Sequence, residues 1–156
     1  MADALGVDEA TLPPGDLPVA RLAERFLGYL RDTVARETVD DHPEFWTYAL
    51  VSDLAADAPD LGLATVLMCL AGAETPEEAA QIAAGPLEDL IAQHGPALID
   101  EIEVLATRAP RFAYALTGVW PQGNQASLLW ARVEAARRDV PSLDDGAPLP
   151  PPDGLG

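Results

Sequence analysis

Residues 60–78 read DLGLATVLMCLAGAETPEE, and this stretch decides the fold class. Its first part, residues 60–71, is apolar around the whole circumference of a helix, which is typical of a helix at the centre of a fold. Its last four residues, TPEE, have the pattern of a helix start. Thr75 can cap the first turn and Glu78 can complete a capping box, with a proline between them at the first helical position. The stretch therefore predicts a buried helix, a tight corner and a second helix.

The same apolar periodicity, punctuated by proline and glycine, continues in both directions along the chain. The second helix is predicted to run over 75–85, and further helices are predicted at 18–36, 43–56, 86–94, 96–108, 110–116 and 125–138. No stretch of the sequence alternates as a strand requires, and no repeat of fixed length is found. The sequence predicts an all-α fold of about seven short helices, packed as an irregular bundle or as stacked helical hairpins.

The two ends of the chain differ in composition from the middle. Residues 1–16 contain acidic residues and a proline pair with little periodicity, which is typical of a flexible leader. Residues 141–156 are rich in proline, glycine and aspartate, so we expect a disordered or extended tail. The interval between them, residues 17–140, is expected to be a single helical domain.

The chain of 156 residues has 26 acidic and nine basic residues, all arginine, and its net charge is −17. This balance argues against binding to nucleic acid or to an anionic membrane, because both need a basic face. It permits a basic protein partner, which a negative field would steer. The first residues lack the pattern of a signal peptide, and the longest uncharged run, 61–73, is too short to span a bilayer. We therefore expect a cytoplasmic protein.

The charges are also segregated along the sequence. The arginines concentrate in the first and the last predicted helix, whereas the middle helices carry carboxylates expected to face outward: Glu77, Glu78, Glu88, Asp89, Asp100 and Glu101. If the middle helices pack side by side, they form one acidic surface that can attract a cationic partner. The alternative interpretation is that the charges are spread around the molecule and only confer solubility.

The stretch from 85 to 120 carries the most distinctive pattern of the chain. It contains GPLEDL at 85–90, HG at 94–95, Ile102-Glu103, PRF at 110–112 and ALTGVW at 115–120. This pattern resembles an uncharacterised bacterial domain family of unknown function, in which a GPLEDLL-x-HG segment is followed by IE, PRF and AL-GVW elements. The resemblance implies no activity, substrate or catalytic residue.

Polar residues in this stretch are the candidate binding residues. His94 shares a helix face with the apolar residues Leu87, Leu90 and Ile91, so it is expected to point toward the core. Glu103, Arg111 and Trp120 could converge with it where the helices meet. One interpretation is a small pocket that uses His94 as a base or hydrogen-bond donor. The other is a buried polar network that locks the corners between short helices.

The remaining candidates have simpler interpretations. Glu88 and Asp89 are expected to be solvated or to complement the helix dipole. Cys69, in an apolar run, is expected to be a buried structural residue. Asp40-Asp41-His42 suits a polar loop better than a metal site, and the sequence contains no Gly-rich nucleotide loop and no paired metal-ligand motif. We therefore expect no metal, no cofactor and no catalytic residue.

Two classes of function fit these observations. The first is an interaction module that binds another protein, such as an immunity- or antitoxin-like inhibitor of a basic protein. The second is a small enzyme or ligand-binding domain that uses the corner of His94, Glu103 and Arg111. The absence of a nucleophile with its base, of a metal set and of a cofactor loop in the sequence favours the first class.

Overall fold

The structure, a computed structural model, describes residues 6, 8, 16–33, 41–121, 123 and 127–155. In this part of the chain every regular element is a helix, which confirms the predicted all-α fold. The elements are α2 (Val19–Thr33), α3 (Phe45–Asp57), α4 (Pro59–Gly72), α5 (Pro76–Ile82), the π-helical turn η2 (Ala83–Leu87), α6 (Glu88–Arg108), α7 (Pro110–Leu116) and α8 (Leu128–Ala136). The predicted leader lies outside the described residues, apart from Gly6, Asp8 and Asp16.

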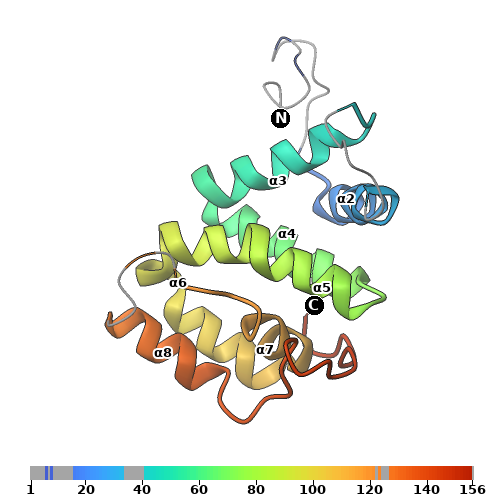
Figure 1. Cartoon of the computed structure of the whole chain (residues 1–156). Coiled ribbons are helices and arrows are strands. Elements are labelled where there is room, and N and C mark those ends of the chain that lie inside the picture. Colours follow the sequence, from blue (N-terminus) through green and yellow to red (C-terminus); the bar gives the residue numbers. More distant parts are fainter. Residues whose placement is uncertain are drawn as a thin grey trace.

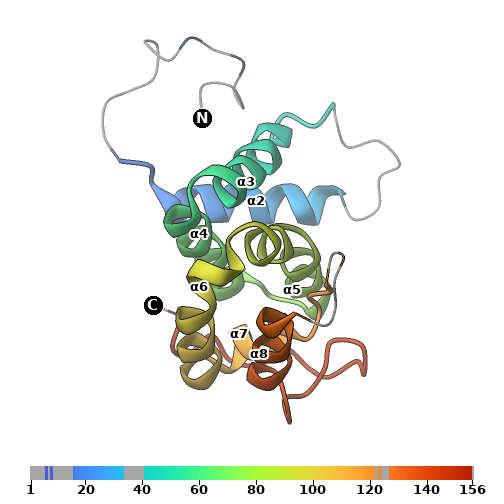
Figure 2. The ribbon, with the colours of Figure 1, turned by 90° about the vertical axis from the view of Figure 1, so that its left-hand side faces the viewer.

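The helices pack as an irregular bundle. Figures 1 and 2 show α2 and α3 together at one end of the molecule and α7 and α8 at the other, with α4 and α6 between them. α4 packs most extensively against α2 and also contacts α3, α6 and α7, whereas α6 packs mainly against α8. One apolar core joins these contacts, and Phe26, Phe112 and Tyr114 are among its largest fully buried side chains.

α4 is central, as predicted, but it is not buried on every side. Its inner face contributes Leu63, Val66, Cys69 and Leu70 to the core. On another side of the same helix Leu61 is 42% exposed and Met68 is 36% exposed. The prediction of burial around the whole circumference is therefore wrong for this stripe. Uniform apolarity identifies a central helix, but it does not tell which side lacks a neighbour.

The pair Gly95-Pro96 does not end a helix, contrary to the prediction of separate helices at 86–94 and 96–108. Both residues lie inside α6, which continues to Arg108. Proline disfavours the helical conformation of the preceding residue mainly through a clash with that residue's Cβ, and glycine has none. Gly95 also permits the close packing of α8, since a Cβ at this position would lie 2.6 Å from Leu129 Cδ2.

The predicted break at Gly85-Pro86 is present, but as a kink rather than as a helix end. Gly85 has a non-helical backbone conformation (φ −110°, ψ −107°) within η2, and the chain continues directly from α5 through η2 into α6. At the other predicted boundaries, α2 begins at Val19 and α3 begins two residues after Pro43. α8 is shorter than the predicted helix at 125–138, and residues 34–36 and 124–126 lie outside the described residues.

The tail, described for residues 141–155, has no helix or strand, as its prolines lead one to expect. It is held against the core, so of the two predicted alternatives, a disordered or an extended tail, the structure has the extended one. Leu155 is only 4% exposed and belongs to the core, and Leu143 and Leu149 pack against it. The composition of the tail correctly predicts that it has no helix or strand. It does not predict that three of its leucines pack against the core.

Candidate functional site

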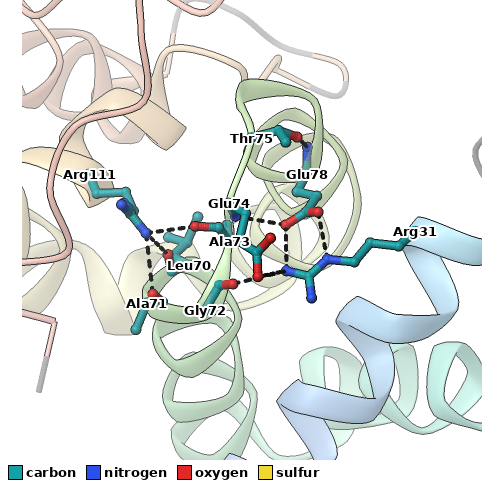
Figure 3. A network of polar contacts seen from close by, with 9 residues as sticks. All are labelled: Arg31, Leu70, Ala71, Gly72, Ala73, Glu74, Thr75, Glu78 and Arg111. Atoms are coloured by element: carbon teal, nitrogen blue, oxygen red, sulfur yellow. Dashed lines mark hydrogen bonds and ion pairs between the residues drawn. The ribbon is translucent and has the colours of Figure 1, made fainter.

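A polar network joins α2, α4, α5 and α7 at the C-terminal end of α4 (Figure 3). Its buried centre is Arg111, at the start of α7, which is 7% exposed. Arg111 Nη1 donates to the carbonyl oxygens of Leu70, Ala71 and Ala73 at 2.9, 3.2 and 3.0 Å. Because these carbonyls form the negative end of the α4 dipole, they stabilise a cation. Burial lowers the pKa of the Arg111 guanidinium, although arginine starts so high that the charge is retained.

The same network contains the buried carboxylate of Glu78, which is 5% exposed. Arg31 of α2 holds it with two hydrogen bonds, Nε to Oε1 at 2.7 Å and Nη2 to Oε2 at 3.0 Å. Thr75 Oγ1 accepts from the Glu78 N–H at 3.2 Å, so the predicted helix cap is confirmed. Glu78 Oε2 accepts from the Glu74 N–H at 2.8 Å, one residue before the position of a usual capping box. The prediction that Glu78 faces outward is wrong, since its side chain is buried against Arg31. Arg31 is distant in sequence, so the local pattern around Glu78 gives no sign of this contact.

His94 is half-buried on α6 and contacts α3. Its Nε2 lies 2.7 Å from the carbonyl oxygen of Ala56. Since a carbonyl can only accept, Nε2 carries the hydrogen and donates it. The hydrogen bond of His94 to the backbone ties α6 to the end of α3.

Glu103 lies nine residues after His94 on α6, which places it about 14 Å along the helix axis and on the opposite side. It accepts two hydrogen bonds from Arg132 of α8, at 2.8 Å from Nε and 2.7 Å from Nη2. Arg132 Nη2 also donates to Asp100 at 2.6 Å. These hydrogen bonds lower the pKa of Glu103 and raise that of Arg132. The cluster fastens α8 to α6.

Two of the predicted residues do meet, namely Glu88 and Trp120. Glu88 Oε2 accepts from the Trp120 backbone N–H at 2.8 Å, and the Trp120 side chain is 57% exposed. Glu88 and Asp89 both lie in the first turn of α6, and both are half-buried. The predicted pocket of His94, Glu103, Arg111 and Trp120 is not assembled, because their hydrogen bonds lead to α3, α8, α4 and Glu88 respectively.

The other candidate residues of the described part have structural surroundings. No group of three or more His, Cys, Asp or Glu side chains in this part of the chain could hold a metal ion. Cys69 is fully buried, as predicted, and burial raises the pKa of its thiol to about 12. His42 Nδ1 accepts from the Glu44 N–H at 3.1 Å, as in a structural loop, while Asp40 lies outside the described residues. None of the described helices is long and apolar enough to cross a bilayer.

A groove between α2 and α4 is the feature that the sequence analysis did not identify. Its floor is formed by small and apolar residues, namely Ala20, Ala23, Leu27, Met68, Ala71 and Gly72. Glu24, Arg31 and Glu74 border it. The one sequence feature that could have indicated the groove is the apolar circumference of α4. Where such a helix lacks a neighbour on one side, apolar residues on that side stay exposed.

The fold and these contacts define an all-helical domain, and comparison with known proteins shows its family. Residues 34–140, more than half of the chain, match the family model described as "Family of unknown function (DUF6869)". The chain therefore belongs to this family, and the resemblance to a family of unknown function is confirmed. The matched residues include α3 to α8, whereas α2 and the tail lie outside them. No curated protein and no solved structure matches the chain.

Proposed function

We propose that this protein is a non-catalytic interaction module whose groove between α2 and α4 binds an amphipathic helix with basic residues along its edges. One observation carries the proposal: a groove open to solvent is lined mainly by small and apolar residues, and its polar lining consists of two carboxylates and Arg31. Binding of a helix in a groove uses such a floor for the apolar face of the helix. Exposed apolar surface rimmed by polar residues is typical of protein interaction sites.

The floor suits a helix that presents medium-sized apolar side chains. The alanines keep the lining of the groove low, Gly72 lets the side chain of Leu27 pack closely against α4, and Met68 offers a flexible side chain that adapts to its partner. Leu61 lies two turns before Met68 on the same side of α4, and its 42% exposure lengthens the apolar stripe. The stripe is therefore long enough to receive successive turns of a partner helix.

The charges at the groove favour a basic partner. Two carboxylates, those of Glu24 and Glu74, line the groove together with Arg31. Arg31 is paired with Glu74 and with the buried Glu78, so the carboxylates around the groove outnumber its one guanidinium. Elsewhere Arg25, Arg132 and Arg137 are paired with carboxylates of the chain itself. These ion pairs leave the net charge of −17 unchanged, because each pair contributes one charge of either sign. The excess of carboxylates supplies a negative field that speeds association with a cationic protein.

The polar side chains that could have formed a pocket support the same conclusion through their contacts. Arg111 and Glu78 stabilise helix ends, His94 binds a backbone carbonyl and Glu103 binds Arg132. The proposal therefore describes an immunity- or antitoxin-like binder that acts in the cytoplasm on a basic protein, and not on nucleic acid or a membrane.

A peptide-binding experiment tests the groove. The probe is a fluorescent amphipathic helical peptide of leucine and lysine, titrated with the wild-type protein and with Met68→Gln. Loss of the apolar contact is expected to weaken binding about tenfold, the equivalent of about 1.4 kcal/mol. Val104→Gln on α6 is the matched control, because Val104 is also exposed (60%) but lies outside the groove. Equal weakening by both variants would contradict the proposal.

The same pair of variants identifies the natural partner. We expect a basic protein from the native host to be retained by the wild type and by Val104→Gln, and to be lost from Met68→Gln. Its association rate should fall as salt is raised, because the field is screened. A partner that binds all three proteins equally, or whose association is insensitive to salt, would show that the groove is not the binding site.

A further inference from the structure

The tail carries a second observation, independent of the groove. Residues 147–155 lie beside α6 and α7 without helix or strand (Figures 1 and 2). They follow position 140, where the family match ends, whereas the residues that hold them lie within the match. Part of the family domain is therefore covered by an extended segment that does not belong to the matched region.

Two buried donors hold the backbone of this segment. Tyr114 Oη donates to the carbonyl oxygen of Ala147 at 2.7 Å, and Arg111 Nε donates to that of Pro150 at 2.6 Å. Arg111 also donates to the carbonyl oxygens of Leu70, Ala71 and Ala73, so contacts within the helical domain hold this donor in place. Tyr114 is fully buried in α7 and directs its hydroxyl to the segment. Both donors contact main-chain oxygens only, and they would accept any segment that presents its carbonyls in the same extended form.

The composition of the segment suits such recognition. Prolines hold the backbone in an extended conformation and lack an N–H that would need a partner, which lowers the entropic cost of binding. Pro148, Pro151 and Pro152 are exposed. Their role is to shape the backbone, while its carbonyl oxygens make the contacts. Protein grooves that bind proline-rich peptides exploit the same preformed, low-entropy backbone.

The far end of the segment is fitted more tightly. Gly154 has a φ of +79°, and a Cβ at this position would lie 2.3 Å from the carbonyl oxygen of Arg108. Leu155, the next residue, is 4% exposed within the core. Only glycine followed by an apolar residue fits here, so this end adds side-chain specificity to the two backbone contacts.

We infer that the surface formed by Arg108, Arg111 and Tyr114 is a binding site for an extended proline-rich peptide, and that residues 147–155 are its intramolecular ligand. The segment detaches while the helical core stays folded, and the vacated site binds the same sequence supplied in trans. The bound tail competes with any external peptide through its high effective concentration.

Two measurements test this inference. In the full wild-type chain, the backbone amides of 147–155 should exchange with deuterium through local opening, faster than the core amides of α4 and α6. The variant Leu155→Asp should release the tail and retain the helical circular dichroism of the wild type. A fluorescent peptide of residues 145–155 should then bind this variant at least tenfold more tightly than it binds the wild-type protein.

A third variant isolates the site itself. Adding Tyr114→Phe to Leu155→Asp removes the hydroxyl donor but keeps the ring, and it should weaken peptide binding by roughly 2- to 12-fold. The inference is overturned if the tail amides exchange only with global unfolding, or if Leu155→Asp abolishes the helical signal. In those cases residues 147–155 are an integral part of the core. It is overturned equally if the folded Leu155→Asp protein does not bind the peptide, or if the hydroxyl makes no difference.

Discussion

The Arg31 guanidinium donates two hydrogen bonds, of 2.7 and 3.0 Å, to the two oxygens of the buried Glu78 carboxylate. Arg31 also donates to the carbonyl oxygen of Gly72 at 3.2 Å, so one side chain of α2 contacts both sides of the corner between α4 and α5. Since α2 precedes the residues matched by the family model, this contact fixes an additional helix on the family domain. It thereby holds one wall of the groove in place.

Replacement of Glu78 by alanine should reduce the free energy of unfolding by about 1–3 kcal/mol, because Arg31 and the Glu74 N–H would each lose an acceptor. The cost stays below that of a fully buried pair, since the side chain of Arg31 is 38% exposed and can be hydrated. Urea denaturation measures the difference. Glu77→Ala is the control: Glu77 is exposed in the same turn, and its change should lie within about 0.5 kcal/mol. Equal effects would refute the inward orientation of Glu78.

The stability that Glu78 provides should depend on pH. Burial opposes ionisation of its carboxyl group, but the hydrogen bonds from Arg31 and from the Glu74 N–H outweigh this, so the pKa of Glu78 is lower than usual. A carboxyl whose pKa is lower in the folded state stabilises the fold above its unfolded pKa of about 4.3, and this contribution disappears as the pH falls through the folded value. The difference in unfolding free energy between wild type and Glu78→Gln should therefore be largest at neutral pH and shrink below about pH 4. If the difference in unfolding free energy grew in acid, the pKa of Glu78 would be raised in the folded state and not lowered.

Arg111 should matter more for its geometry than for its charge. Arg111→Met leaves the final carbonyls of α4 and that of Pro150 without their donor, and it should cost about 1–3 kcal/mol in the free energy of unfolding. Arg111→Lys keeps the cation but cannot reach both sets of carbonyls at once, so it should recover only part of this loss. Thermal unfolding of both variants beside Arg138→Met, an exposed arginine, provides the comparison. If Arg111→Lys were as stable as the wild type, only the positive charge of Arg111 would matter, and not the geometry of its hydrogen bonds.

Cys69 should be inert in the folded protein. With its pKa raised to about 12 by burial, the thiol is protonated at neutral pH and is also shielded from solvent. A thiol-specific chromogenic reagent should react slowly with the native protein and rapidly in denaturant. Fast reaction without denaturant would mean that α4 opens readily or that the groove side of the helix exposes the thiol.

Features determined by neighbours in the sequence could be predicted. Thr75 caps α5 because the acceptor and the N–H of Glu78 are three residues apart, and His94 faces inward because Leu90 and Ile91 share its side of α6. The all-α class follows from the same local periods. Such features need no knowledge of how the helices pack.

Features determined by tertiary contacts could not be predicted. Glu78 is drawn inward by an arginine 47 positions earlier, and Arg111 binds carbonyl oxygens, which every residue has and which the sequence therefore does not distinguish. Gly95-Pro96 carries the local signal of a helix end. The packing of Leu129 against Gly95 is a tertiary contact that this signal does not contain. The groove depends in the same way on how α2 crosses α4.

A pair of glycine substitutions tests the packing of the helices themselves. Gly28 in α2 has nothing within 4 Å of the position that a Cβ would occupy, whereas at Gly62 in α4 a Cβ would lie 2.9 Å from Leu54 O and 3.1 Å from Leu90 Cδ1. Gly28→Ala should raise the free energy of unfolding by about 0.5–1 kcal/mol, because alanine restricts the unfolded chain and favours the helix. Gly62→Ala gains the same propensity but must displace the backbone of α3, so it should be destabilising by about 1–3 kcal/mol. Both variants are compared with wild type by chemical denaturation. If Gly62→Ala stabilised the protein as Gly28→Ala does, α3 and α4 could not be in the close contact that places the apolar stripe of α4 beside α2.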